Sequence, residues 1–204
     1  MLTNIIDQFQ KKLINGFNEN YLFIFTAKMS CINCDNSLFR ASRNCHLKCI
    51  QYLIESGSDV LAKDIYGNTS LMYASYEGHL DCVQYLIESK SDISAKSQHG
   101  QTALMYASEI GHLECAQCLI ESKSDILAKD NCGRTALMFA SENGNSKCVQ
   151  CLIESGSDVL AKNIDNQTAL MLASMNNHLE CEEFIKNIIE NGTELGPKFA
   201  GKFD

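Results

Sequence analysis

A period of 33 residues runs through the chain and limits the folds open to it more than any other feature. Residues 70–102 and 103–135 align without a gap and agree at 22 of 33 positions. Residues 136–168 follow in the same register, a weaker copy precedes them at 37–69, and a fading copy starts at 169. A fixed period of this length indicates one supersecondary unit repeated in tandem. We therefore expect an elongated solenoid with an extended surface.

The pattern inside one copy predicts two short helices joined by a turn. In residues 70–102, Thr69 is suited to cap the start of a first helix, and Gly78 is suited to end it. Residues 81–89 carry one continuous apolar stripe and predict a second helix, and turn-forming residues follow at 93–100. Helices this short are not stable alone, so each is expected to bury its apolar face against the neighbouring repeat.

These residues resemble the ankyrin repeat. One register of its consensus pattern is matched by Gly67, Thr69, Leu71, Ala74, Gly78, His79, Leu80, Leu86, Asp92 and Ala95. The resemblance implies an all-α solenoid of stacked helix-turn-helix repeats with β-turn fingers, covering about residues 37–190. The repeats are expected at about 37–69, 70–102, 103–135, 136–168 and 169–190. It further implies a non-catalytic adaptor, scaffold or inhibitor that binds another protein on its concave face.

Two departures from the family pattern bear on stability. The family's histidine in the first helix is replaced by Met72, Met105, Met138 and Met171. A methionine is expected only to pack there, whereas the imidazole helps tie one turn to the next. The family's glycine after the second helix survives as Gly57 and Gly156 but becomes Lys90 and Lys123. If the backbone stays left-handed, each lysine costs about 1 kcal/mol.

The two ends of the chain fall outside the repeat pattern. In residues 1–36, apolar side chains are spaced for an amphipathic helix. This segment is predicted to be a helical cap or extension that shields the first repeat, or alternatively a helix that binds a partner or a membrane surface. Residues 191–204, which hold three glycines and the chain's one proline, are expected to form a flexible tail.

Charge and hydropathy exclude some functions. The net charge of −8 argues against a nucleic-acid partner, because binding to phosphates needs a basic surface. The sequence has no apolar run near the roughly 18 residues that a membrane-spanning helix needs. We therefore expect a protein partner, no nucleic acid and no membrane span.

Eleven cysteines require an explanation. Five of them recur at one repeat position, namely Cys49, Cys82, Cys115, Cys148 and Cys181. Equivalent helices in neighbouring repeats lie about 8–10 Å apart, which is too far for a disulfide between them. We expect these thiols to be buried and free, which favours a reducing compartment, the cytoplasm or the nucleus.

A second set of cysteines leaves a thiol- or zinc-dependent sensor open as an alternative function. Cys31 and Cys34 form a C-x-x-C pair, and Cys45, His46 and Cys49 follow. Two close ligands followed by another pair suit a tetrahedral zinc site. His46 and Cys49, however, occupy positions that the repeat itself explains, so a degenerate cap turn is the competing interpretation. Metal binding by Cys31, Cys34 and Cys45 stays open, and so does structural self-assembly through end-to-end stacking.

No pattern in the sequence predicts catalysis. The histidines His79, His112 and His178 recur within the repeat, which indicates a turn-stabilising role. No nucleophile pattern converges on them, and no phosphate-binding or nucleotide-binding motif is present. We expect a monomeric protein that is not an enzyme and needs no cofactor.

Positions that vary between similar repeats indicate where packing does not dictate the residue. They cluster at the turn tip and near the end of the first helix, which in ankyrin-like proteins line the concave face. The predicted partner-binding residues are Tyr66, Tyr76, Glu77, His99, Glu109, Ile110, Arg134, Glu142 and Asn143. A basic row follows the finger bases at Lys63, Lys96, Lys129 and Lys162. Beside it, the row of Tyr73, Tyr106, Phe139 and Leu172 suits either inter-repeat packing or binding.

Overall fold

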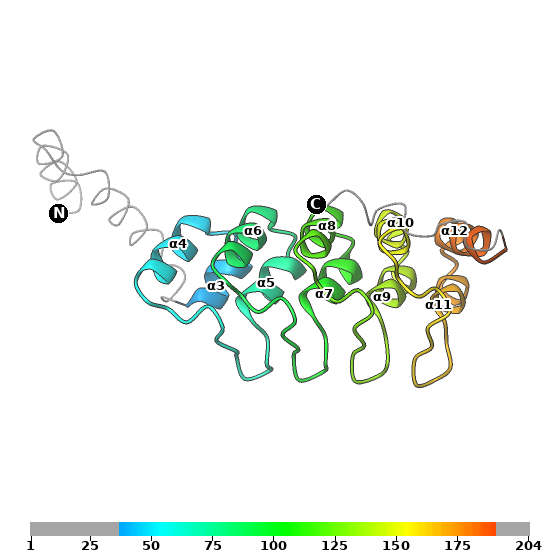
Figure 1. Cartoon of the computed structure of the whole chain (residues 1–204), viewed down its shortest axis with the longest axis horizontal. Coiled ribbons are helices and arrows are strands. Elements are labelled where there is room, and N and C mark those ends of the chain that lie inside the picture. Colours follow the sequence, from blue (N-terminus) through cyan, green and yellow to red (C-terminus); the bar gives the residue numbers. More distant parts are fainter. Residues whose placement is uncertain (1–36, 191–204) are drawn as a thin grey trace, which may run out of the picture.

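The computed structural model describes residues 37–190, and in this range the chain is a row of helix-turn-helix units stacked along one axis (Figure 1). The first helices of the units are α3 (Leu38–Arg43), α5 (Ser70–Tyr76), α7 (Ala103–Ile110), α9 (Ala136–Glu142) and α11 (Ala169–Met175). The second helices are α4 (Leu47–Glu55), α6 (Leu80–Glu88), α8 (Leu113–Glu121), α10 (Ser146–Glu154) and α12 (Leu179–Glu190). The expected all-α solenoid is confirmed. The predictions for residues 1–36 and 191–204 lie outside the described residues.

Each first helix begins at a threonine or serine cap, as the sequence predicts. In α5 the Thr69 side chain accepts a hydrogen bond from the Met72 amide, and Thr102 does the same for Met105 in α7. The second helix of this repeat begins one residue earlier than expected, at Leu80, with His79 as its N-cap residue. The helix starts therefore follow from local sequence signals to within one residue.

The methionines of the first helices do more than pack, which corrects the sequence expectation. The Met72 Sδ lies 3.4 Å from the Thr69 backbone nitrogen, and the Met105 Sδ lies 3.5 Å from that of Thr102. A thioether sulfur is a weak hydrogen-bond acceptor. In these two repeats it completes the cap by accepting from the threonine amide, so methionine ties the turn to the helix.

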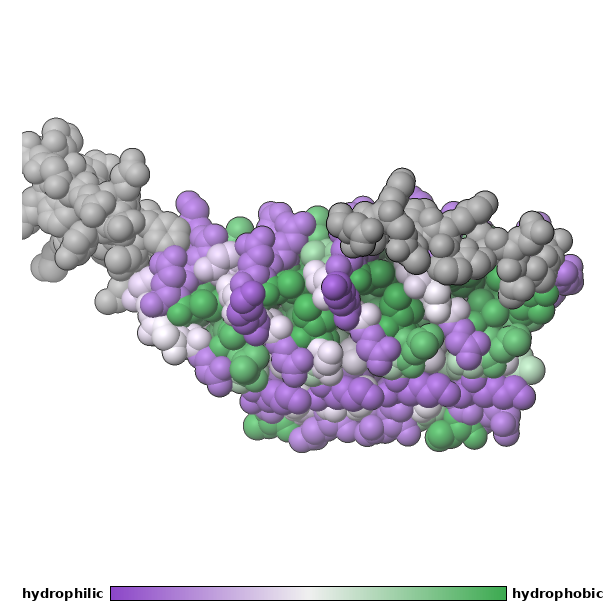
Figure 2. All heavy atoms as spheres, viewed as in Figure 1, coloured by the Kyte–Doolittle hydropathy of each residue, from purple (hydrophilic) through white to green (hydrophobic). Residues whose placement is uncertain are grey.

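The finger segments that link the repeats are hairpin turns joined to one another. Within the first finger the Asp64 amide donates to the Asn68 carbonyl over 3.0 Å. Neighbouring fingers are joined by backbone bonds from Gln98 to Tyr66 and, one repeat later, from Asn131 to His99. Figure 2 shows a continuous hydrophilic band along these segments. The fingers therefore form one connected edge of the molecule.

The lysines of the basic row stabilise this edge. The Nζ atoms of Lys63, Lys96 and Lys129 donate to the backbone carbonyls of Lys96, Lys129 and Lys162, over 3.0, 2.8 and 3.1 Å respectively. Each lysine thus spans one repeat and binds the next one. The row is a chain of inter-repeat hydrogen bonds.

The cysteine row lies in the core, as expected. Each of its five members is 1% exposed or less, and the nine cysteines between residues 37 and 190 are free thiols. Burial raises the pKa of Cys82 to about 12 and that of Cys115 and Cys148 to about 11. These thiols are protonated at neutral pH and serve as small apolar packing groups.

The backbone after the second helices is left-handed, which confirms the expected strain. Lys90 and Lys123 adopt φ values of +69° and +67°, at the position where Gly57 and Gly156 adopt +91° and +99°. A Cβ atom added at either glycine would have no neighbour within 4 Å. The two lysines are therefore strained by their backbone conformation and not by crowding.

None of the helices between residues 37 and 190 is both long and apolar enough to cross a membrane.

Candidate functional site

The first helices and the fingers together form one surface, which we call the inner face. The predicted binding residues lie there in two groups. The helix-end group comprises Tyr76, Glu77, Glu109, Ile110, Glu142 and Asn143, at or next to the last residues of α5, α7 and α9. The finger group comprises Tyr66, His99 and Arg134. Three large side chains are well exposed, with Tyr66 at 58%, Tyr76 at 41% and Ile110 at 43%.

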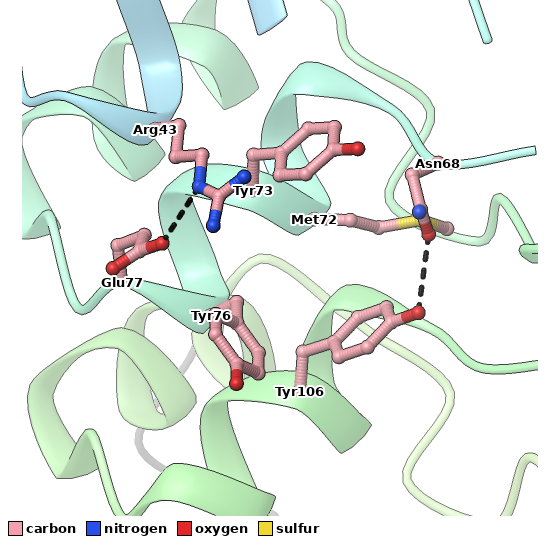
Figure 3. A pocket seen from close by; sticks show the side chains of 7 residues that line it. All are labelled: Arg43, Asn68, Met72, Tyr73, Tyr76, Glu77 and Tyr106. Carbon is pink, nitrogen blue, oxygen red and sulfur yellow. Dashed lines mark hydrogen bonds and ion pairs between the residues drawn. The ribbon is translucent and has the colours of Figure 1, made fainter. Parts of the chain in front are cut away.

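A small cavity opens on the inner face between α3, α5, α7 and the first finger (Figure 3). Its volume is about 230 Å³, and its lining residues are Arg43, Asn68, Met72, Tyr73, Tyr76, Glu77 and Tyr106. The rings of Tyr76 and Tyr106 meet edge to face, with centroids 6.0 Å apart and an interplanar angle of 81°. The Tyr106 hydroxyl donates to Asn68 Oδ1 over 3.1 Å. The cavity is thus aromatic, with polar groups at its rim.

An ion pair closes the end of the cavity nearest α3. Arg43 Nε lies 3.2 Å from Glu77 Oε1, and the Arg43 side chain is 63% exposed whereas that of Glu77 is 32% exposed. On the finger side, the Tyr73 hydroxyl donates to Asp64 Oδ2 over 2.5 Å. Burial acts to raise the pKa of Asp64, but hydrogen bonds from Tyr73, Asn68 and Tyr66 outweigh it and lower that pKa. Asp64 therefore stays ionised and holds the finger in place.

Arg134 joins the finger group to the helix-end group. Its Nε lies 3.1 Å from Asp130 Oδ2, and its Nη1 lies 3.5 Å from Glu142 Oε2. The guanidinium carbon sits 4.1 Å from the centroid of the Phe139 ring. Asn143 is also engaged within the chain, because its amide donates to the Phe139 carbonyl over 3.0 Å. Arg134, Glu142 and Asn143 consequently hold the inner face in shape.

Glu109 differs from the other acidic residues of the inner face. Burial raises its pKa, the nearby Glu142 carboxylate raises it further, and Arg134 lowers it in part. Within residues 37–190, no lysine or arginine forms an ion pair with its carboxylate. Glu109 is thus a half-buried carboxylate whose charge Arg134 offsets in part, without forming an ion pair with it.

The row of aromatic residues serves packing and lines the cavity at once. Phe139 and Leu172 are buried, which agrees with inter-repeat packing. Tyr73 and Tyr106 are half-buried and point their hydroxyls at finger residues while their rings border the cavity (Figure 3). Phe139 and Leu172 therefore fit the interpretation as packing residues, whereas Tyr73 and Tyr106 also border a cavity in which a partner could bind.

Arg43 and Asn68 are cavity residues that the sequence prediction missed. Arg43 lies 33 residues before Tyr76, so it belongs to the variable row that contains Tyr76, Glu109 and Glu142. Reading that row back by one repeat would have found it. Asn68 lies at a turn tip, where residues vary between repeats, but its contact with Tyr106 joins residues 38 positions apart and leaves no local signal.

The histidines of the turns have the structural role that the sequence predicts. The Nε2 atoms of His79 and His178 lie 3.0 Å from the carbonyl oxygens of Arg43 and Glu142, at the end of the preceding first helix. The ring of His112 packs on Gly78, where an added Cβ would come within 2.4 Å of its Nδ1. These rings hold neighbouring repeats together.

Only some of the predicted zinc ligands lie within the residues that the structure describes. Cys45 is exposed, whereas Cys31 and Cys34 lie outside the described residues. Between residues 37 and 190, no three or more His, Cys, Asp or Glu side chains are grouped as a metal would require. The proposed zinc set therefore stays a prediction.

Comparison with known families decides the identity of the fold. A family model described as ankyrin repeats (3 copies) matches residues 10–97 and 90–163, which is more than half of the chain. The chain belongs to the ankyrin repeat family. Ankyrin repeats are generally protein–protein interaction modules and are typically non-catalytic. No curated protein matches the chain at a significant level.

Proposed function

We propose that this ankyrin repeat protein is a non-catalytic module that binds a partner protein through its inner face, as an adaptor, scaffold or inhibitor. The observation that carries the proposal is the exposure of Tyr66, Tyr76 and Ile110 on that face. Exposed aromatic and aliphatic side chains beside mixed charge are typical of the residues that dominate binding energy in protein interfaces. These three occupy positions that vary between repeats, and each keeps at least 41% of its surface exposed.

Affinity capture from native lysate tests this proposal. The test variant carries Tyr66→Ala, Tyr76→Ala and Ile110→Ala together. A matched control carries Gln84→Ala, Gln117→Ala and Gln150→Ala, which shortens three exposed side chains on the second helices α6, α8 and α10. We expect the wild type and the control to retain a partner that the test variant loses, with helicity by circular dichroism unchanged in all three. Equal retention by all three proteins would rule out the inner face as the binding surface.

Free thiols support a proposal about location. The nine cysteines between residues 37 and 190 are unbridged, and most of those in the core are protonated at neutral pH because burial raises their pKa. Unbridged thiols in this number suit a reducing compartment. We accordingly place the protein in the cytoplasm or the nucleus. Fluorescence microscopy of the tagged chain tests this, and a secreted product would contradict it.

One observation favours a second candidate function, structural self-assembly. The last described repeat exposes Met171, Met175 and Leu179, whereas the matching Met72 and Met105 are buried. An apolar repeat face can stack on another copy. Light scattering against concentration separates this candidate from a monomeric binding module. A molar mass that rises with concentration supports self-assembly, and a constant monomer mass excludes it.

A further inference from the structure

Arg134 shows how the inner face of this protein holds a guanidinium group. The group lies 4.1 Å from the Phe139 ring centroid and 3.5 Å from the Glu142 carboxylate, and Asp130 accepts its Nε–H over 3.1 Å. A ring beneath the guanidinium plane supplies cation–π attraction, and a carboxylate beside it supplies an ion pair. The repeat that contains α9 therefore has a complete cation site that is filled by its own arginine.

The repeat before it keeps the ring and one of the two carboxylates, but it has Ser97 in place of Asp130 and no arginine. The 33-residue period places Tyr106, Glu109 and Gln101 where the next repeat has Phe139, Glu142 and Arg134. Burial raises the pKa of the Tyr106 phenol, a hydrogen bond with Ser97 lowers it in part, and the nearby Glu109 carboxylate raises it further. Because Gln101 is neutral, this repeat supplies no cation at that position, and Glu109 interacts instead with the more distant charge of Arg134.

The cavity beside Tyr106 has the size for one side chain. Its volume of about 230 Å³ is below the roughly 300–1,000 Å³ that is usual for small-molecule pockets. The Tyr76 ring, which is 41% exposed, lies edge to face with Tyr106 and forms one wall. In Figure 3 the two tyrosines lie together on one side, and Arg43 with Glu77 lies on the other.

The charges around the cavity favour a cation. Arg43 and Glu77 neutralise each other at 3.2 Å. Two more carboxylates lie next to the lining tyrosines: Asp64 accepts a hydrogen bond from Tyr73, and Glu109 follows Tyr106 by one turn of α7. Asp64 is thus already engaged, whereas Glu109 forms no ion pair with any of the described residues. An incoming positive charge next to Glu109 would compensate a half-buried carboxylate that Arg134 offsets only in part.

We propose that Tyr76, Tyr106 and Glu109 form a site that receives an arginine side chain of the partner protein. The proposal rests on the proposed function, since it names the chemistry of a residue that the inner face binds. The guanidinium stacks on the Tyr106 ring and pairs with Glu109, as Arg134 does with Phe139 and Glu142. A lysine binds less well, because its ammonium group lacks the planar fork that pairs with a carboxylate while it stacks on a ring.

Titration with a short peptide tests the site on the full chain. The probe is a capped Gly-Gly-Arg-Gly-Gly peptide, and the matched control carries citrulline, which has the shape of arginine without its charge. Backbone amide resonances in NMR spectra report binding. We expect saturable shifts around Tyr76 and the end of α7 with the arginine peptide, and about tenfold weaker binding of the citrulline peptide. Equal binding of the two peptides, or no shifts with either, would overturn the proposal.

Two charge variants sharpen the test. Gln101→Arg supplies the missing cation within the chain, so we expect it to weaken binding of the arginine peptide about tenfold. Gln84→Arg adds the same charge on the exposed surface of α6 and should leave the affinity unchanged. The idea fails if Gln101→Arg binds the peptide as tightly as the wild type, or if Gln84→Arg weakens binding to the same extent.

A third variant predicts a gain of binding. Arg134→Gln removes the cation from Phe139 and Glu142, so we expect a second set of shifting resonances around α9. If those resonances stay in place in a folded variant, the repeat comparison is wrong. Failure of these titrations while Tyr66→Ala, Tyr76→Ala and Ile110→Ala together still abolish partner capture would refute the arginine site alone. Unchanged capture by that triple variant would refute the proposed function instead.

Discussion

Lys90 and Lys123 occupy a left-handed backbone position at which the repeats on either side carry glycine. A side chain with a Cβ atom is strained in that conformation, whereas glycine adopts it freely. The surroundings add no crowding, since a Cβ at Gly57 or Gly156 would meet no atom within 4 Å. The energetic difference between the two kinds of repeat is therefore conformational.

Replacing one of these lysines tests that strain. We expect Lys123→Gly to raise the free energy of unfolding by about 1 kcal/mol, and Gly156→Lys to lower it by about the same amount. Urea denaturation followed by circular dichroism measures both changes. Changes in the free energy of unfolding that are equal in size and opposite in sign would identify the backbone conformation as the cause. A loss of stability in Lys123→Gly would show instead that the lysine side chain makes a stabilising contact.

Buried serine hydroxyls in the first helices form a second feature at this scale. Ser75, Ser108 and Ser141 are fully buried, and within the described part of the chain their hydroxyls have no hydrogen-bond partner. Ser42, at the same repeat position, donates to the Leu38 carbonyl over 2.8 Å. A buried polar group without a partner costs stability.

The corresponding substitution should be stabilising. We expect Ser108→Ala to raise the free energy of unfolding by about 1 kcal/mol, because it removes an unpaired hydroxyl and introduces the best helix former. Ser42→Ala is the control and should give no gain, since it removes a hydroxyl that has a partner. Thermal denaturation compares the two, and equal shifts in Tm would contradict the account.

At the scale of the helix, Glu109 is unfavourably placed. It is the penultimate residue of α7, where the negative end of the helix dipole meets its carboxylate. Burial raises its pKa above the unfolded value, so the folded state binds the proton more tightly than the unfolded state. The ionised form of Glu109 thus destabilises the fold as the pH rises from the unfolded pKa through the folded one.

This placement predicts a pH-dependent effect of one substitution. Glu109→Gln should raise the free energy of unfolding at neutral pH and have little effect below pH about 4, where the carboxylate is protonated in both states. Denaturation curves of both proteins between pH 3 and pH 8 measure the difference. A stability difference that stays constant across this range would contradict the assignment.

The helices follow from local sequence signals, and the contacts between repeats do not. Threonine caps such as Thr69 and the glycine at Gly78 locate α5 within one residue, because these signals act within a few positions. The Met72 sulfur as an acceptor escaped prediction, since methionine is an uncommon capping residue. The sequence showed that the lysines recur every 33 residues. It did not show that each one donates to a carbonyl of the next repeat, because only the stacking of the repeats places these groups close together.

At the scale of the molecule, stability resides in contacts between neighbouring repeats. The lysine bonds, the finger bonds and the His79 and His178 rings each connect one repeat to the next. Solenoids of this kind gain their stability from such nearest-neighbour interfaces and keep one continuous surface for a partner. The inner face inherits its shape from these bonds, and its variable positions are left to determine what it binds.

The most direct test of the inner face as the binding surface is carbene footprinting of the complex with the captured partner, read by mass spectrometry. We expect labelling of Tyr76 and Ile110 to fall when the partner binds, while labelling of the exposed residues of α6, α8 and α10 is unchanged. Protection of those outer helices, with Tyr76 and Ile110 labelled as in the free protein, would contradict the account.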